Sequence, residues 1–205
     1  MALRGWGVVL AAATVLSLMA LASNATSMSQ LEAEANTLLA VRTTISRLLS
    51  AGTLWAGLAV VSGWLVRRPF QAFAAGVVAL LVALVVHYGV GLILGMFDPN
   101  VWTENPEWFT GAVVLGGPLG LVGAIARRPD LWGVLARLFV PAGAVFEPFV
   151  LRMFTSPVIM PWPGRVASVL SGLVLLTAGT VGCIRVLVAA RKQQSTRERR
   201  ASAET

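Results

Sequence analysis

The stretches GWLVRRP (residues 63–69) and GAIARRP (residues 123–129) end in the same three residues, 60 positions apart. In both stretches, two arginines and a proline close a run of small and branched apolar residues. Arginine and lysine accumulate in the cytoplasmic loops of membrane proteins. Proline lacks an amide hydrogen and is therefore favoured at the first position of a helix. The two copies of RRP thus predict two short cytoplasmic turns, each between a pair of membrane-spanning helices.

The composition supports a membrane protein. The chain has 205 residues, of which 57% are hydrophobic and 12% are charged, whereas about a quarter of the residues of a soluble domain are charged. Residues 70–97 contain no Asp, Glu, Lys or Arg, and their ionisable side chains are His87 and Tyr88. About 18 uncharged residues are enough to cross a hydrocarbon layer of roughly 30 Å. We therefore predict an all-α integral membrane bundle.

Apolar runs separated by polar breaks predict six transmembrane helices in one domain, residues 1–190. The runs cover residues 4–22, 49–66, 70–96, 110–126, 131–151 and 166–190. The first run ends in a small-residue pattern that also fits a signal-peptide cleavage site, so whether residues 1–22 are retained stays open. Residues 29–47 start with the capping-box pattern SQLE and continue with apolar residues at helical spacing. They predict an amphipathic outer helix, either on the membrane surface or extending the second span.

The distribution of basic residues predicts the orientation. With the N-terminus inside, twelve of the sixteen Lys and Arg residues fall on the cytoplasmic side, and the opposite orientation would leave only four there. All seven tryptophans then lie at the predicted ends of spans, where amphipathic rings are favoured. We predict a multi-pass protein of the plasma (cell) membrane with both termini cytoplasmic. Residues 191–205 form a basic tail that we expect to be disordered and attracted to anionic lipid.

The two RRP turns also suggest an internal repeat. An offset of 60 residues places residues 70–90 opposite residues 130–150, which predicts a parallel repeat of two helical hairpins. Unrelated hairpins of similar composition are the alternative. Three small-residue motifs, Gly91-x-x-x-Gly95, Gly116-x-x-x-Gly120 and Ser168-x-x-x-Gly172, allow helices to approach closely. They predict either internal packing or a face for a partner or a second copy of the chain.

Four residues near the predicted outer ends of spans are the candidate ligand-binding residues: His87, Tyr88, Glu147 and Arg152. Ionisable groups inside a bilayer are costly and usually pair or line a pathway. One hypothesis is an outward-facing site in which Glu147 and Arg152 bind a small cation or solute and His87 adjusts the charge. The other is that His87 and Glu147 lie at headgroup depth and are merely hydrated.

Two further side chains bear on function. Arg137 lies inside the fifth predicted span, and we expect its side chain to reach back to the inner surface. Cys183 is the single cysteine, which excludes an internal disulfide, and we interpret it as a small apolar residue of the sixth span. The net charge of +7 does not predict nucleic-acid binding, because the basic residues lie in pairs at span ends instead of on one polar face.

From residue 36 to about residue 150 the chain resembles an uncharacterised family of small polytopic bacterial integral membrane proteins, a domain of unknown function. The resemblance rests on SAGTLW (residues 50–55), the first RRP, AAGVVALLVALVVHYGVG (residues 74–91), Trp108 and GGPLGLVGAIARR (residues 116–128). It implies a polytopic membrane protein and brings no activity with it.

Catalytic chemistry is not predicted. A helical zinc protease site needs two histidines and the chain has one, and no nucleophile elbow, phosphate loop or dinucleotide fingerprint occurs. We therefore predict no catalytic residues, cofactor or metal. The sequence favours a non-enzymatic accessory or interaction subunit that contacts the lipid bilayer and a partner membrane subunit or a second copy. The alternative is a small-solute transporter or a membrane substrate-binding component.

Overall fold

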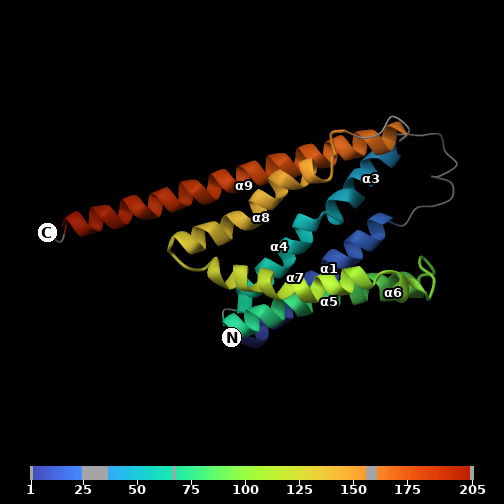
Figure 1. Ribbon diagram of the computed structural model, residues 1–205, viewed down its shortest axis with the longest axis horizontal. Helices are drawn as coiled ribbons and strands as arrows, with labels where there is room; N and C mark the ends of the chain where they lie inside the picture. The colour runs from blue at the N-terminus through green and yellow to red at the C-terminus, as the bar shows by residue number, and fades with distance from the viewer. Residues whose placement is uncertain (1, 25–36, 67, 156–160, 204–205) are drawn as a thin grey trace.

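The computed structural model describes residues 2–24, 37–66, 68–155 and 161–203, and helices make up most of them (Figure 1). The helices are α1 (Ala2–Asn24), α3 (Thr37–Leu49), α4 (Gly52–Val66), α5 (Pro69–Ile93), α6 (Val101–Glu104), α7 (Pro106–Ile125), α8 (Leu131–Val150) and α9 (Trp162–Ala203). No strand occurs in the described residues. The all-α prediction is confirmed.

Six helical segments of the described chain are long and apolar enough to cross a membrane. They are Arg4–Asn24, Thr37–Val66, Pro69–Ile93, Pro106–Ile125, Leu131–Val150 and Trp162–Ser195. Each contains most of one predicted span. The boundaries differ most at the second segment, which starts twelve residues before the predicted residue 49 because α3 continues into α4 across a short break at Ser50 and Ala51.

Helix α3 accounts for the part of the predicted amphipathic segment that the structure describes. The capping-box residues 29–32 lie outside the described residues. Helix α3 packs on α9 and α1, and Ala40 is buried, whereas Leu38, Val41 and Ile45 are exposed. Together with α4, helix α3 forms the second long apolar segment, Thr37–Val66.

Glycines bring α4, α5 and α7 together. A methyl group built on Gly120 of α7 would overlap the carbonyl oxygen of Ala72 in α5, and one on Gly123 would overlap the carbonyl oxygen of Val60 in α4. Such contacts need helices with no side chain at the crossing. The motif Gly116-x-x-x-Gly120 therefore serves internal packing.

The other two small-residue motifs differ from this one. Gly172 packs against Phe154 and Met153 in the turn that follows α8. Gly95 lies beyond the end of α5, has a φ of +68° and would leave a methyl group in open space. Gly91 and Gly95 therefore do not form a helix-packing motif, because α5 ends at Ile93 and Gly95 is the left-handed residue that follows its cap.

The bundle has two unequal parts. Helices α1, α4, α5 and α7 pack on one another, whereas α8 packs mainly along α9, and α9 also contacts α3. Figure 1 shows α8 and α9 side by side, with α3 and α4 crossing the space toward α5 and α7. The two predicted hairpins consequently differ, since α4 packs closely along α5 but α8 turns away from α7.

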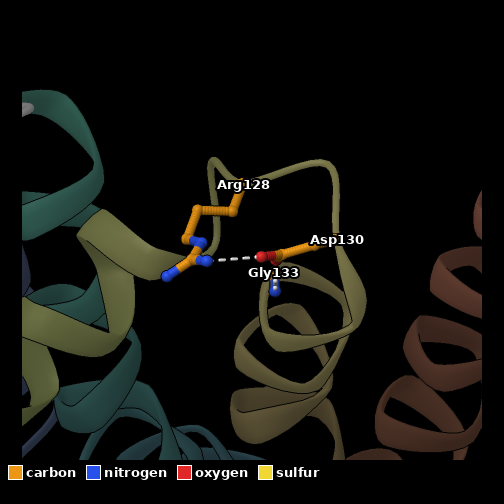
Figure 2. A network of polar contacts seen from close by, with 3 residues as sticks. All are labelled: Arg128, Asp130 and Gly133. Atoms are coloured by element: carbon orange, nitrogen blue, oxygen red, sulfur yellow. Dashed lines mark hydrogen bonds and ion pairs between the residues drawn. The ribbon is translucent and has the colours of Figure 1, made fainter.

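The two RRP turns start their helices in different ways. Pro69 is in the first turn of α5, as predicted, and Arg68 is its extended N-cap residue. Pro129 lies before the cap of α8, and the cap is Asp130, whose carboxylate accepts a hydrogen bond from the amide of Gly133 at 3.0 Å. Arg128 forms an ion pair with the same carboxylate at 2.6 Å (Figure 2). Proline therefore begins a helix after the first RRP turn only. After the second RRP turn, Asp130 caps the helix instead.

We expect the cap at Asp130 to make the stability of the chain depend on pH. The hydrogen bond from the Gly133 amide, together with Arg128, lowers the pKa of the Asp130 carboxyl group. A lowered pKa gives a contribution that is complete above the unfolded value of about 3.9 and is lost as the pH falls through the folded value.

Thermal unfolding in detergent between about pH 7 and about pH 3 tests this. Asp130→Ala is expected to lower Tm slightly at neutral pH and to unfold with less dependence on acid than the wild type. Asp130→Asn retains a capping oxygen and should stay near the wild-type Tm at neutral pH. A wild-type acid profile in Asp130→Ala would contradict the assignment.

The C-terminal residues differ from expectation. Helix α9 continues to Ala203, through most of the residues 191–205 that we predicted to be disordered. Lys, Arg, Gln, Glu and Ala are good helix formers, so a polar sequence of this kind can propagate a helix that the apolar part has already nucleated. Figure 1 shows this end of α9 projecting beyond the other helices.

Candidate functional site

His87 and Tyr88 belong to an aromatic cluster at the end of α5. The Tyr88 ring has its centroid 5.8 Å from Phe97, 6.0 Å from Trp102 and 5.9 Å from Phe109. His87 meets Tyr88 edge-on at 5.4 Å and Phe97 at 5.6 Å. Tyr88 is buried. The cluster therefore joins α5 to α6 and to the start of α7, which is a packing role.

The imidazole of His87 also approaches α1. It lies against the backbone of Ser17, and the Ser17 hydroxyl donates a hydrogen bond to the carbonyl oxygen of Ala83 at 2.7 Å. The Nδ1 atom of His87 is buried and has no hydrogen-bond partner. The contacts of His87 and Ser17 thus lie where α1 meets α5, and His87 links this contact to the aromatic cluster.

Glu147 binds the start of another helix. Its Oε1 accepts a hydrogen bond from the Gly52 amide at 2.7 Å, and its Oε2 accepts one from the Thr53 amide at 2.9 Å and a short one from the Thr53 hydroxyl. The first amides of a helix have no partner within the helix and carry its positive dipole end. Glu147 of α8 is therefore the N-terminal cap of α4, supplied from outside that helix.

Arg152 lies in the turn after α8. It is exposed, and its φ of +51° places it in the left-handed region, which is uncommon for a residue other than glycine. Its amide donates to the carbonyl oxygen of Phe149 at 3.2 Å, and its carbonyl oxygen accepts from the Thr155 amide at 3.1 Å. The backbone of Arg152 therefore closes the turn, while its side chain faces outward.

The four predicted site residues do not form one group. His87 and Tyr88 contact α1, α6 and α7, whereas Glu147 contacts the start of α4. No hydrogen bond, ion pair or ring contact among the described residues joins one pair to the other. The predicted site did not include the partners of Glu147, although the small residues 50–53 at the start of an apolar helix were a signal for them.

A crevice at the opposite end of the bundle contains Arg137. It has a volume of about 230 Å³ and lies between α4, α8 and the residue that follows α7. The lining residues are Gly57, Val60, Val61, Trp64, Ala126, Ala136, Arg137 and Val140. The Nε atom of Arg137 is buried and has no hydrogen-bond partner. The prediction that Arg137 simply reaches back to the surface did not include this crevice.

Trp64 connects the crevice to a second arginine. The guanidinium of Arg127 lies 4.8 Å from the centroid of the Trp64 ring, a distance at which a cation is attracted to the ring face. It also donates a short hydrogen bond to the Trp64 carbonyl oxygen, one of the free acceptors at the end of α4. Two arginines thus lie at the same crevice, one inside it and one at its rim.

The described residues contain one histidine, one cysteine and several acidic side chains. They hold no group of three or more His, Cys, Asp or Glu side chains that a metal ion would need. Cys183 is a free, half-buried thiol in α9.

Comparison with known proteins identifies no relative. The chain has no significant match among protein-family models, curated proteins or solved structures. The resemblance to a family of small bacterial membrane proteins stays a prediction, and function must be argued from the residues themselves.

Proposed function

We propose that the chain is a non-enzymatic accessory or interaction subunit that crosses the plasma membrane six times. The observation that supports this most is α9. Its apolar segment is the least buried of the six, and among the described helices it packs mainly on α8 and α3. The exposed apolar side chains include Leu170, Leu173, Val174, Val181, Ile184, Leu187 and Val188. Such a face is suited to a partner helix as well as to lipid.

The transport alternative receives less support from the contacts. Glu147 would be the main ligand of a cation or solute, but both of its carboxylate oxygens already accept hydrogen bonds from α4. His87 and Tyr88 lie in another part of the bundle. A site built on these four residues would need α5 and α8 to come together.

Gentle extraction from the native membrane followed by native mass spectrometry tests the proposal. A second polypeptide, or a second copy of the chain, is expected at fixed stoichiometry. Val181→Trp on the exposed face of α9 should release it, and Val114→Trp on the exposed face of α7 is the matched control, since both valines are exposed. A monomer without any partner, or equal loss in both variants, would count against the proposal.

We also propose that both termini and both RRP turns face the cytoplasm, as the basic residues favour. In a Cys183→Ser background, Thr103→Cys in α6 should react with a membrane-impermeant maleimide in intact cells. Ser195→Cys near the end of α9 should react only after the cells are opened. Both positions are exposed, so accessibility within the fold is matched. The reverse pattern of labelling would overturn the orientation.

A further inference from the structure

The crevice around Arg137 combines a charge with apolar walls. Seven of its eight lining residues carry no charge, and valines of α4 and α8 face it from both sides. Val61 is 51% exposed and Trp64 is 45% exposed, so the crevice opens toward the outside of the bundle. A molecule that moves within the bilayer reaches such an opening from the side.

Arg137 lacks a counter-ion in the described part of the chain. The salt bridge found there joins Arg128 to Asp130, so no carboxylate is paired with Arg137. Its Nε atom is buried without an acceptor. Arg137 as a whole is half-buried, so its charge is only partly hydrated, and such a charge is costly unless it is paired and hydrogen-bonded. The side chain therefore calls for an anion with acceptor oxygens.

We propose that this crevice binds an anionic phospholipid, with the phosphate on Arg137 and one acyl chain along Val60, Val61 and Val140. Arginine holds phosphate through charge-assisted hydrogen bonds from its guanidinium, and because Nε is buried, the two terminal nitrogens of Arg137 are the donors available to the phosphate. Basic pockets between transmembrane helices are a known setting for acidic lipid headgroups. Arg127, held on the face of Trp64, supplies a second positive charge at the rim.

The choice of lipid over free phosphate follows from the walls of the crevice. A free phosphate would leave the apolar part of the crevice unfilled, whereas an acyl chain fills it and makes van der Waals contacts with the valines. The proposal is independent of whether the chain has a protein partner, because the partner face suggested above is on α9 and the crevice is formed by α4, α7 and α8.

Native mass spectrometry of the delipidated full-length chain in a neutral detergent provides the test. The probes are phosphatidylglycerol, phosphatidylcholine and inorganic phosphate, each titrated separately. The wild type is expected to hold one phosphatidylglycerol more tightly than any phosphatidylcholine. Arg137→Gln should weaken that binding about tenfold, the change expected when one charge-assisted interaction is lost. Arg185→Gln on the exposed part of α9 is the matched control and should bind as the wild type does.

A second measurement separates binding from folding. Phosphatidylglycerol should raise the Tm of the wild type and of Arg185→Gln, because a ligand stabilises the state that binds it, but not that of Arg137→Gln. Without lipid, Arg137→Gln should unfold close to the wild type, since it removes a half-buried charge that has no carboxylate partner in the described residues. Equal binding of phosphatidylglycerol by Arg137→Gln, equal binding of both lipids, or competition by inorganic phosphate alone would overturn the proposal. The proposal would also be overturned if the protein extracted from its native membrane carried an acidic polypeptide that Arg137→Gln no longer binds.

Discussion

Gly120→Ala is expected to destabilise the bundle by about 1–3 kcal/mol or more, the range found for overpacking a close-packed interior. The added methyl group would overlap the carbonyl oxygen of Ala72, and the carbonyl oxygen of Gly120 itself lies where a methyl group on Gly63 would be. These neighbours are backbone atoms, which no rotamer change can move. Helices α5 and α7 would have to separate, and α4 packs against both of them.

Gly111→Ala is the matched control in the same helix. A methyl group there meets nothing within 4 Å, and alanine favours a helix over glycine by about 0.5–1 kcal/mol. This variant should therefore equal or slightly exceed the wild type in thermal unfolding followed in detergent. The pair Gly76→Ala and Gly89→Ala repeats the comparison in α5, since Gly76 faces Gly116 and Gly89 faces open space. If Gly120→Ala were as stable as Gly111→Ala, the close packing of these helices would be wrong.

The helices were largely predictable because hydropathy acts locally. An uncharged run such as residues 70–97 predicts a single long apolar helix, and α5 covers most of this run. Helix ends were less predictable. The charged residues after residue 190 suggested disorder, yet α9 continues, because helix propensity and not hydropathy decides where a helix already formed will stop.

The candidate site was less predictable, because it depends on which helices meet. The offset between the RRP turns placed His87 and Glu147 at equivalent positions of two hairpins. In the structure α5 packs along α4 and α7, whereas α8 packs mainly along α9. Pro141 of α8 contacts Gly179 and Gly182 of α9. Nothing in the local sequence of α8 indicates this choice. The glycine motif of α7 did predict a helix contact, because small residues are what allow two helix backbones to approach closely.

Glu147→Ala is expected to destabilise the protein by about 2 kcal/mol, the upper part of the range for losing an N-cap. It removes the acceptor of three hydrogen bonds at the start of α4 and leaves the amides of Gly52 and Thr53 without a partner. Glu147→Gln keeps one acceptor oxygen and should lie between Glu147→Ala and the wild type. Thermal unfolding in detergent measures the differences.

Thr53→Val provides the matched partner variant. It removes only the hydroxyl donor and should cost about 1 kcal/mol, as for one hydrogen bond. In the double variant with Glu147→Ala, the second substitution should cost almost nothing, because the interaction is already lost. Such coupling between contacting residues is what a double-mutant cycle detects. Fully additive losses would contradict a direct bond between Glu147 and Thr53.

The same variants distinguish a cap from a binding site. If Glu147 served a cation or solute, Glu147→Gln would abolish binding while leaving unfolding unchanged, and Thr53→Val would have no effect on either. If Glu147 is the cap of α4, stability falls in the order Gln, then Ala, and amide hydrogen exchange accelerates first at the start of α4, next to the break at Ser50 and Ala51. The Glu147 carboxylate then stabilises the break between α3 and α4 in the second long apolar segment, because it binds the first amides of α4.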